Sequence, residues 1–120
     1  MTGRAPAVDR GALERLVEMT GNDPVFVDEL VQTYLEDADI QVEAMRAAAG
    51  LGSAEAMIRP AHSLKANSLS VGADQLAEQC RQLETDGRSG TVDRARERVE
   101  AVAAELGQVK AELTRLRADR

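Results

Sequence analysis

His62 is the side chain of this sequence best suited to chemistry, and it is the only histidine among 120 residues. A histidine keeps a large neutral fraction near neutral pH, so one ring nitrogen is available as a nucleophile. Lys65 follows three residues later, one helical turn away, where its ammonium can meet the charge of an incoming phosphoryl group. Because phosphoryl transfer depends mainly on positioning and charge stabilisation, the pair is suited to phosphoryl acceptance on His62 with electrostatic support from Lys65.

The spacing of apolar residues places His62 on a helix, outside the side that faces the core. The expected core face consists of Met57, Ala61, Leu64, Ser68 and Val71. At 100° per residue, His62 falls about 140° from the centre of that face. Its neighbours on the helix surface are small or apolar, namely Ile58, Ala66 and Leu69. We expect these three residues to form part of a rim on which a partner docks.

From position alone, a simpler interpretation of each residue is stronger. A lone histidine in a helical protein is usually a boundary residue without a role, and a lone lysine is usually solvated. Ser63 and Asn67 are interpreted as surface residues, and Cys80 as a small buried apolar side chain. The wider pattern of the sequence must therefore decide whether His62 has a function.

Five helices are expected, after a flexible lead over residues 1–8. They begin near Asp9, Pro24, Ser53, Ala73 and Thr91, and the first four end near Asn22, Ala49, Gly72 and Thr85. Polar N-cap residues and a proline suited to the first helical turn mark several starts, and glycines mark several ends. Residues 86–90 are predicted to form a plain loop.

The apolar series of the two longest segments indicates a helical bundle. The second helix is expected to bury Phe26, Leu30, Tyr34, Ala38, Val42, Met45 and Ala49. The fifth is expected to bury Val92, Val99, Val102, Leu106, Val109, Leu113 and Leu116. No segment alternates with period two, and short loops favour antiparallel neighbours. We predict an all-α fold, an up-and-down antiparallel four-helix bundle with a short additional N-terminal helix.

Composition narrows the classes of function. The formal net charge of −6 repels phosphate backbones, so nucleic acid is not an expected partner. The chain has no apolar run of 18 residues and no signal-like start, so we expect a cytoplasmic protein without a membrane partner. With one histidine and one cysteine, most multi-ligand metal centres and the Ser-His or Cys-His catalytic arrangements are excluded.

Several motifs at fixed distances resemble one known family. His62-Ser63-Leu64-Lys65 is followed by Val71-Gly72-Ala73, by Leu76 and by Cys80-Arg81-Gln82-Leu83-Glu84. Upstream stand Gly-Asn-Asp-Pro-Val-Phe over residues 21–26 and Tyr-Leu-Glu-Asp over residues 34–37. This series resembles the histidine-containing phosphotransfer (HPt) domain of two-component phosphorelays, whose pattern reads roughly His-x-Leu-Lys-Gly-Ser-Ser, Gly-Ala, Leu, Cys-x-x-Leu-Glu. The resemblance covers a domain over about residues 9–118.

The resemblance implies that His62 accepts a phosphoryl group from a receiver-domain aspartate or a kinase and passes it to another receiver domain. The implied partners are receiver domains of response regulators or a hybrid histidine kinase, and the implied activity is that of a carrier without kinase activity of its own. No cofactor or metal is expected in this chain, because the Mg²⁺ used in transfer lies in the receiver's acidic pocket. Since docking is transient, we expect a monomer.

The resemblance also suggests roles for single residues. Lys65 matches the family's lysine near the phosphohistidine. Glu84 takes the position where some members have a glutamine that hydrogen-bonds the histidine. Two residues depart from the pattern: Ala66 replaces a common glycine, and Pro60 lies two residues before His62, where it predicts a local kink.

Other classes of protein stay open at this point. An HPt-like module that binds receivers or kinases without phosphotransfer is one alternative, and the phosphotransfer domain of a chemotaxis-type kinase is another. The dimerisation and phosphoacceptor helix of sensor kinases matches poorly, because Ser63 follows the histidine in place of an acid and Asn67 stands in place of a proline. No glycine-rich nucleotide-binding signature favours an enzyme that consumes ATP.

Overall fold

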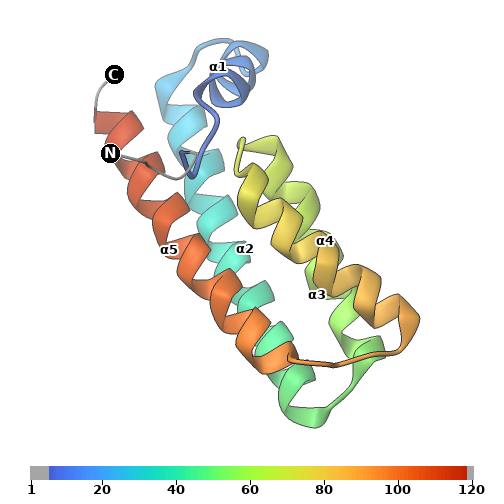
Figure 1. The fold of residues 1–120 in the computed structure, drawn as a ribbon. Coiled ribbons are helices and arrows are strands. Elements are labelled where there is room, and N and C mark those ends of the chain that lie inside the picture. The colour runs from blue at the N-terminus through green and yellow to red at the C-terminus, as the bar shows by residue number, and fades with distance from the viewer. Residues whose placement is uncertain (1–5, 119–120) are drawn as a thin grey trace.

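Four long helices and one short helix make up the part of the chain that the computed structural model describes, residues 6–118 (Figure 1). They are α1 (Arg10–Met19), α2 (Pro24–Leu51), α3 (Ala54–Ser70), α4 (Asp74–Ser89) and α5 (Ala95–Ala118). These residues contain no strand. The predicted all-α fold with an additional N-terminal helix is confirmed.

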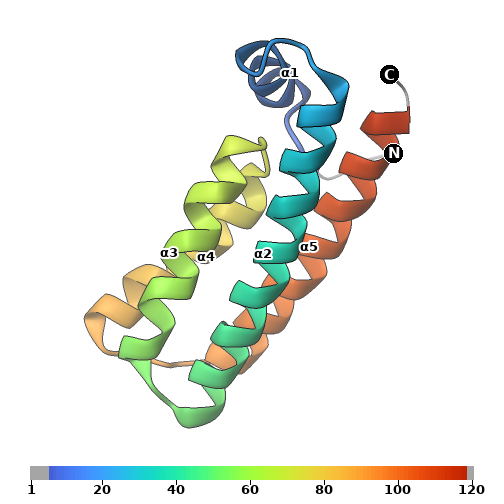
Figure 2. The ribbon, with the colours of Figure 1, turned by 180° about the vertical axis from the view of Figure 1, so that it is seen from behind.

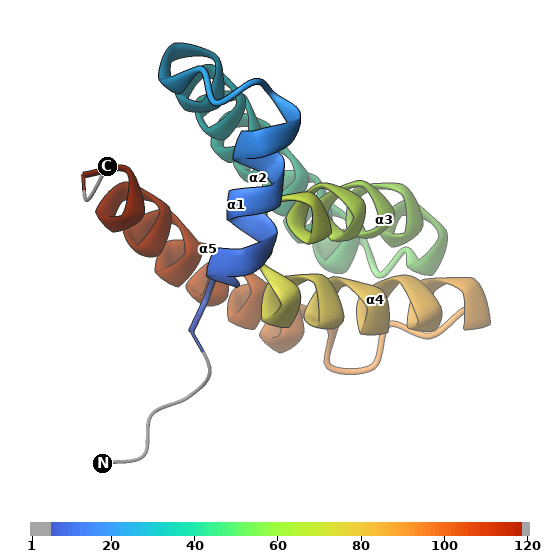
Figure 3. The same ribbon diagram turned by 90° about the horizontal axis from the view of Figure 1, so that it is seen from above.

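The long helices form a ring in which each packs against two neighbours. Both α2 and α4 contact α3 on one side and α5 on the other. Seen from behind, α3 and α2 lie in front of α4 and α5 (Figure 2). The short helix α1 crosses one end of the bundle, as the view from above shows (Figure 3).

Side-chain caps fix the starts of three helices where the sequence predicts them. The Asp9 carboxylate accepts a hydrogen bond from the Gly11 amide at 3.0 Å, and the Asp23 carboxylate accepts one from Val25 at 3.0 Å. Ser53 Oγ accepts from the Ala56 amide at 3.1 Å. Each cap satisfies a backbone N–H that has no partner within the helix.

The predicted core face of α3 is buried as expected. It comprises Met57, Ala61, Leu64 and Ser68, followed by Val71 at the C-cap. The Ser68 hydroxyl is satisfied inside the core, because its Oγ lies 2.8 Å from Tyr34 Oη of α2. Burial raises the pKa of Tyr34 to about 12, so its hydroxyl stays protonated. The register of α3 sends His62 out of the core.

The first turns of α2 differ from the prediction. Phe26 is 45% exposed and Leu30 is half-buried, while Val27 and Val31 are the buried residues of these turns. Both pairs keep a spacing of four residues, so periodicity alone does not choose between them. The valines continue the series through Tyr34 that faces the core along the rest of α2.

The flexible lead predicted over residues 1–8 is wrong at its end. Ala7 and Val8 are buried in the core, and residues 1–5 lie outside the described part of the chain. The Asp9 amide donates a hydrogen bond to the Gly72 carbonyl at 2.7 Å. Gly72 has φ +79°, and a Cβ there would lie 2.7 Å from the Asp9 carbonyl oxygen. Gly72 is therefore needed for the close approach of the N-terminal segment.

The plain loop predicted over residues 86–90 is also wrong, because α4 continues to Ser89. Gly87 is buried within this last stretch, against the start of α3. A Cβ at Gly87 would lie 2.8 Å from the Ala54 carbonyl oxygen and 2.9 Å from Ile58 Cγ1. The glycine thus lets two helices touch, and packing on α3 extends α4 beyond the point where local sequence signals end it.

Two further boundaries concern α3 and α5. The fifth helix begins at Ala95 instead of Thr91, after a turn in which Thr91 Oγ1 accepts from the Asp93 amide at 3.1 Å. Helix α3 continues without a break through Pro60, which is buried. A proline removes one backbone hydrogen bond from a helix interior, but here it does not end the helix. No helix within residues 6–118 is long and apolar enough to cross a membrane.

Replacing Gly87 with alanine should destabilise the bundle by about 1–3 kcal/mol, because the added methyl group overlaps the backbone of α3. Gly107 in α5 is the matched control, since an added Cβ there meets no atom within 4 Å. Gly107→Ala should stabilise the protein by about 0.5–1 kcal/mol. Urea unfolding followed by circular dichroism measures both changes. A neutral or stabilising Gly87→Ala would contradict the close helix contact.

Candidate functional site

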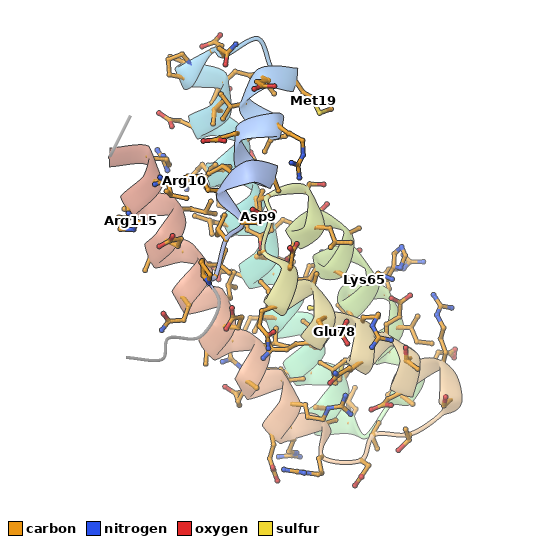
Figure 4. All side chains as sticks on the ribbon, turned by 45° about the horizontal axis from the view of Figure 1, so that its top comes forward. Asp9, Arg10, Met19, Lys65, Glu78 and Arg115 are labelled. Atoms are coloured by element: carbon orange, nitrogen blue, oxygen red, sulfur yellow. The ribbon has the colours of Figure 1, made fainter. Side chains whose placement is uncertain are left out.

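His62 lies on α3 next to two residues that fix the helix in the core. Ala61 and Leu64 are fully buried, while the His62 side chain is 55% exposed. Lys65 of α3 and Arg115 of α5 lie on opposite sides of the bundle in Figure 4. The imidazole is thus accessible to a partner, as its helical position predicts.

Glu84 of α4 reaches the imidazole from the neighbouring helix. Cys80 and Leu83 hold this part of α4 in the core, and the Glu84 side chain at its edge is only 8% exposed. Glu84 Oε2 lies 2.9 Å from His62 Nδ1. The structure therefore contains the hydrogen bond that the resemblance suggested. When Nδ1–H donates this hydrogen bond to the carboxylate, the lone pair of the neutral ring is on Nε2.

Lys65 also points to Glu84. Its Nζ lies 2.7 Å from Glu84 Oε1, and the lysine side chain is 25% exposed. This ion pair offsets the charge of a buried oxygen that has no other hydrogen-bonding partner among the described residues. Lys65 is therefore fixed between α3 and α4, and its ammonium is held one helical turn from His62.

Arg88 is a residue of the site that sequence reasoning missed. Its Nη2 and Nε lie 2.8 Å and 3.3 Å from Glu84 Oε2. It stands four residues after Glu84 on α4, a spacing that forms ion pairs on helices. The spacing of four residues could have indicated this ion pair from the sequence. The segment from Asp86 onwards was predicted to be a loop, however, and four-residue spacing pairs side chains only on a helix.

These three contacts keep the Glu84 carboxylate ionised despite its burial. The Lys65 ammonium, followed by Arg88 and His62, lowers the pKa of Glu84 to about 2, and desolvation opposes the shift. A buried carboxylate without partners would instead have a raised pKa. The site consequently holds one fixed negative charge beneath a partly exposed imidazole, with two permanent cations beside it.

The residues proposed as a docking rim differ in exposure. Ala66 is exposed and Leu69 is 53% exposed, so both are available to a partner. Ile58 is half-buried, and its Cγ1 lies close to Gly87. The structure thus places two of the three in solvent, and their role in docking stays a prediction.

Ser63 and Asn67 are more than surface residues, because they line a groove between α2 and α3. Asn67 Nδ2 donates to Asp37 Oδ2 at 3.2 Å. This α2–α3 groove has a volume of about 490 Å³. Its lining consists of Leu16, Leu30, Thr33, Tyr34, Asp37, Gln41, Ser63, Asn67, Ser70 and Val71.

The described residues do not favour metal binding or cysteine chemistry. Within residues 6–118, no group of three or more His, Cys, Asp or Glu side chains is placed to hold a metal ion. Cys80 is fully buried, and burial raises the pKa of its thiol to about 12. A protonated buried thiol is a packing residue rather than a nucleophile.

Comparison with known proteins agrees with the fold. The Hpt domain family model matches residues 29–119, so the chain belongs to the histidine-containing phosphotransfer family. The structure is similar to the crystal structure of histidine-containing phosphotransfer protein B (HptB) from Pseudomonas aeruginosa PAO1. The two chains share 30% sequence identity with a TM-score of 0.85, over 98% of this chain and 99% of that chain. A search of curated proteins found no significant match.

Family membership establishes the general function. The chain is a phosphorelay intermediate of two-component signalling, a class whose members transfer phosphoryl groups through a histidine and interact with receiver domains and kinases.

The depressed pKa of Glu84 makes its contribution to stability dependent on pH. The carboxylate stabilises the fold above its ordinary pKa of 4.5, and this contribution is lost as the pH falls towards the folded pKa of about 2. The free energy of unfolding of Glu84→Gln should therefore lie below that of the wild type near pH 6, and the difference should shrink between pH 4.5 and pH 2. Urea titrations across this range measure the difference.

Glu97→Gln is the control for this measurement, because Glu97 is 68% exposed and its ion pair is with the exposed Arg94. Its difference from the wild type should be small at every pH. A Glu84→Gln difference that does not change with pH would show that the carboxylate charge is not what stabilises the contact between α3 and α4.

Proposed function

We propose that His62 is the residue that accepts and donates the phosphoryl group. The family transfers through a histidine, and the sequence contains one. The observation that supports this assignment best is the hydrogen bond of 2.9 Å between His62 Nδ1 and Glu84 Oε2. It orients a partly exposed ring so that Nε2 is the nitrogen left for reaction with a partner.

The tautomer that this bond favours is the reactive one. The Nε2 lone pair attacks the phosphorus of a receiver's aspartyl phosphate, and the P–N bond forms as the P–O bond breaks. The electron pair of that bond leaves with the aspartate carboxylate. The Nδ1 proton stays in place, so the phosphorylated ring is an imidazolium whose positive charge faces Glu84. No proton transfer is required within this chain, and the same path in reverse delivers the phosphoryl group to the next receiver.

Lys65 and Arg88 supply positive charge around the group being transferred. Both contact Glu84 at 2.7–2.8 Å in the unphosphorylated protein, and both have further N–H donors for phosphoryl oxygens. We assign them electrostatic support, with Ile58, Ala66 and Leu69 as part of the surface that meets the receiver. Ala66 in place of glycine leaves that approach open, because its methyl group is small.

The reaction depends on partner proteins. The chain is a carrier without kinase activity of its own, and the Mg²⁺ of the transfer is supplied by the partner's acidic pocket. The specific partners are receiver domains of response regulators or of a hybrid histidine kinase, met by a monomer in transient complexes. We propose the cytoplasm as the compartment, because the ATP that feeds such kinases is there.

Incubation with a ³²P-phosphorylated receiver domain and Mg²⁺ tests the acceptor. The wild-type chain should gain a label that is stable in alkali and labile in acid, whereas His62→Gln should gain none, because no other imidazole is present. Circular dichroism should show the same helical content for both proteins, since the His62 side chain is 55% exposed. Equal labelling of both proteins would exclude His62 as the acceptor. A wild-type chain that binds the receiver without gaining label would indicate an interaction module.

The two lysines of the chain provide a matched test of electrostatic support. Lys65→Met removes the ammonium next to the reacting ring and should slow transfer about 10-fold or more, in line with the loss of one preorganised charge. Lys110→Met changes an exposed residue of α5 and should leave the rate unchanged. Rapid-quench measurement of single-turnover transfer gives both rates. Equal rates for the two variants would leave Lys65 with a structural role only.

A further inference from the structure

The α2–α3 groove lies on the accessible surface next to His62. Going round α3 from His62, Ala66 follows at about 40°, Ser70 at about 80° and Asn67 at about 140°. Ala66 and Ser70 are exposed and small, so only a low ridge separates the imidazole from the groove. Helices α2 and α3 lie side by side on the face seen in Figure 2.

A partner that covers His62 must also reach this groove. A standard protein interface buries about 800 Å² per partner, which is a disc of roughly 16 Å radius. Asn67 is five residues from His62, or about 7.5 Å along the helix axis. An interface of this size centred on the imidazole is wide enough to include the groove.

Asp37 is the one charged residue among the described residues that line the groove. It is half-buried, and its hydrogen bonds come from two neutral amides, Gln41 Nε2 and Asn67 Nδ2, each at 3.2 Å. No arginine or lysine among residues 6–118 forms an ion pair with it, in contrast to Glu84 and Asp86. Leu16, Leu30 and Val71 provide apolar surface in the same groove.

We infer that Asp37 helps to select the receiver partner. Its carboxylate binds a lysine or arginine of the receiver, and an apolar side chain of the receiver next to that cation enters the α2–α3 groove. This inference rests on the proposed function of His62. Asp37 is half-buried and has no cationic partner among residues 6–118, so a receiver that supplies a cation gains binding free energy there, whereas a carboxylate that is already paired offers less. The same carboxylate disfavours receivers that present an acidic residue at this point, so it acts against wrong partners as well.

Charge variants at two positions of α2 test the inference. Asp37→Asn removes the charge and keeps an oxygen acceptor, and Asp37→Lys reverses the charge. Asp39→Asn is the matched control, because Asp39 lies two residues further along the same helix, is exposed and does not line the groove. The probe is the receiver domain that labels the wild-type chain fastest, phosphorylated with acetyl phosphate, and the readout is kcat/KM for transfer to His62 at low salt.

Asp37→Asn should lower kcat/KM about 3–10-fold, Asp37→Lys by more, and Asp39→Asn by less than about 2-fold. The differences should shrink at about 0.5 M salt, where exposed charges are screened. Exchange of a basic receiver residue for glutamate should restore transfer to Asp37→Lys. Melting temperatures close to that of the wild type exclude an effect through stability.

Equal rates for Asp37→Asn and Asp39→Asn would overturn the inference. A dimer of the wild-type chain in sedimentation that Asp37→Lys dissociates would overturn it too, because the groove would then bind a second copy of this chain. A different result would contradict the proposed function, namely equal labelling of His62→Gln and the wild type. With His62→Gln unlabelled and Asp37→Asn as fast as the wild type, the proposed function stands and this inference fails.

Discussion

The buried carboxylate of Glu84 connects the chemistry of this domain with its packing. An ionised carboxylate that is only 8% exposed is costly unless cations and hydrogen-bond donors surround it. Here Lys65 and His62 come from α3 and Arg88 from the same helix as Glu84. The charge is tolerated only while α3 and α4 keep one register, so that register and the orientation of the imidazole are fixed together.

Packing elsewhere along the same pair of helices maintains this register. At one end Gly87 allows the backbone of α3 to touch α4, and at the other Gly72 admits the N-terminal segment against the turn between them. Cys80 and Leu83 of the Cys-x-x-Leu-Glu motif are buried, which brings Glu84 to the boundary of the core. The motif is thus a packing pattern that ends in a functional residue.

Much of the fold follows from local signals, and the failures have tertiary causes. Caps at Asp9, Asp23 and Ser53 depend on neighbouring residues, so the sequence predicts them well. Periodicity places His62 outside the core, but it cannot tell Phe26 from Val27, since both repeat every four residues. The extension of α4 to Ser89 depends on its contact with α3. Arg88 reaches Glu84 because this extension is helical. The contact of Glu84 with His62 is suggested by the family resemblance alone, because local spacing carries no information about a contact between residues 22 positions apart.

The arrangement also explains how a site can hold a phosphoryl group without trapping it. In the proposed relay, a phosphoryl group at Nε2 adds about two negative charges, which Lys65 and Arg88 attract and which Glu84 repels. The same Glu84 stabilises the imidazolium ring that forms. Both cations also contact the carboxylate, so part of their positive charge is offset by Glu84 when they interact with the phosphoryl group. The attraction from the two cations is thus opposed by the carboxylate, an arrangement that suits a carrier that must transfer the group in either direction.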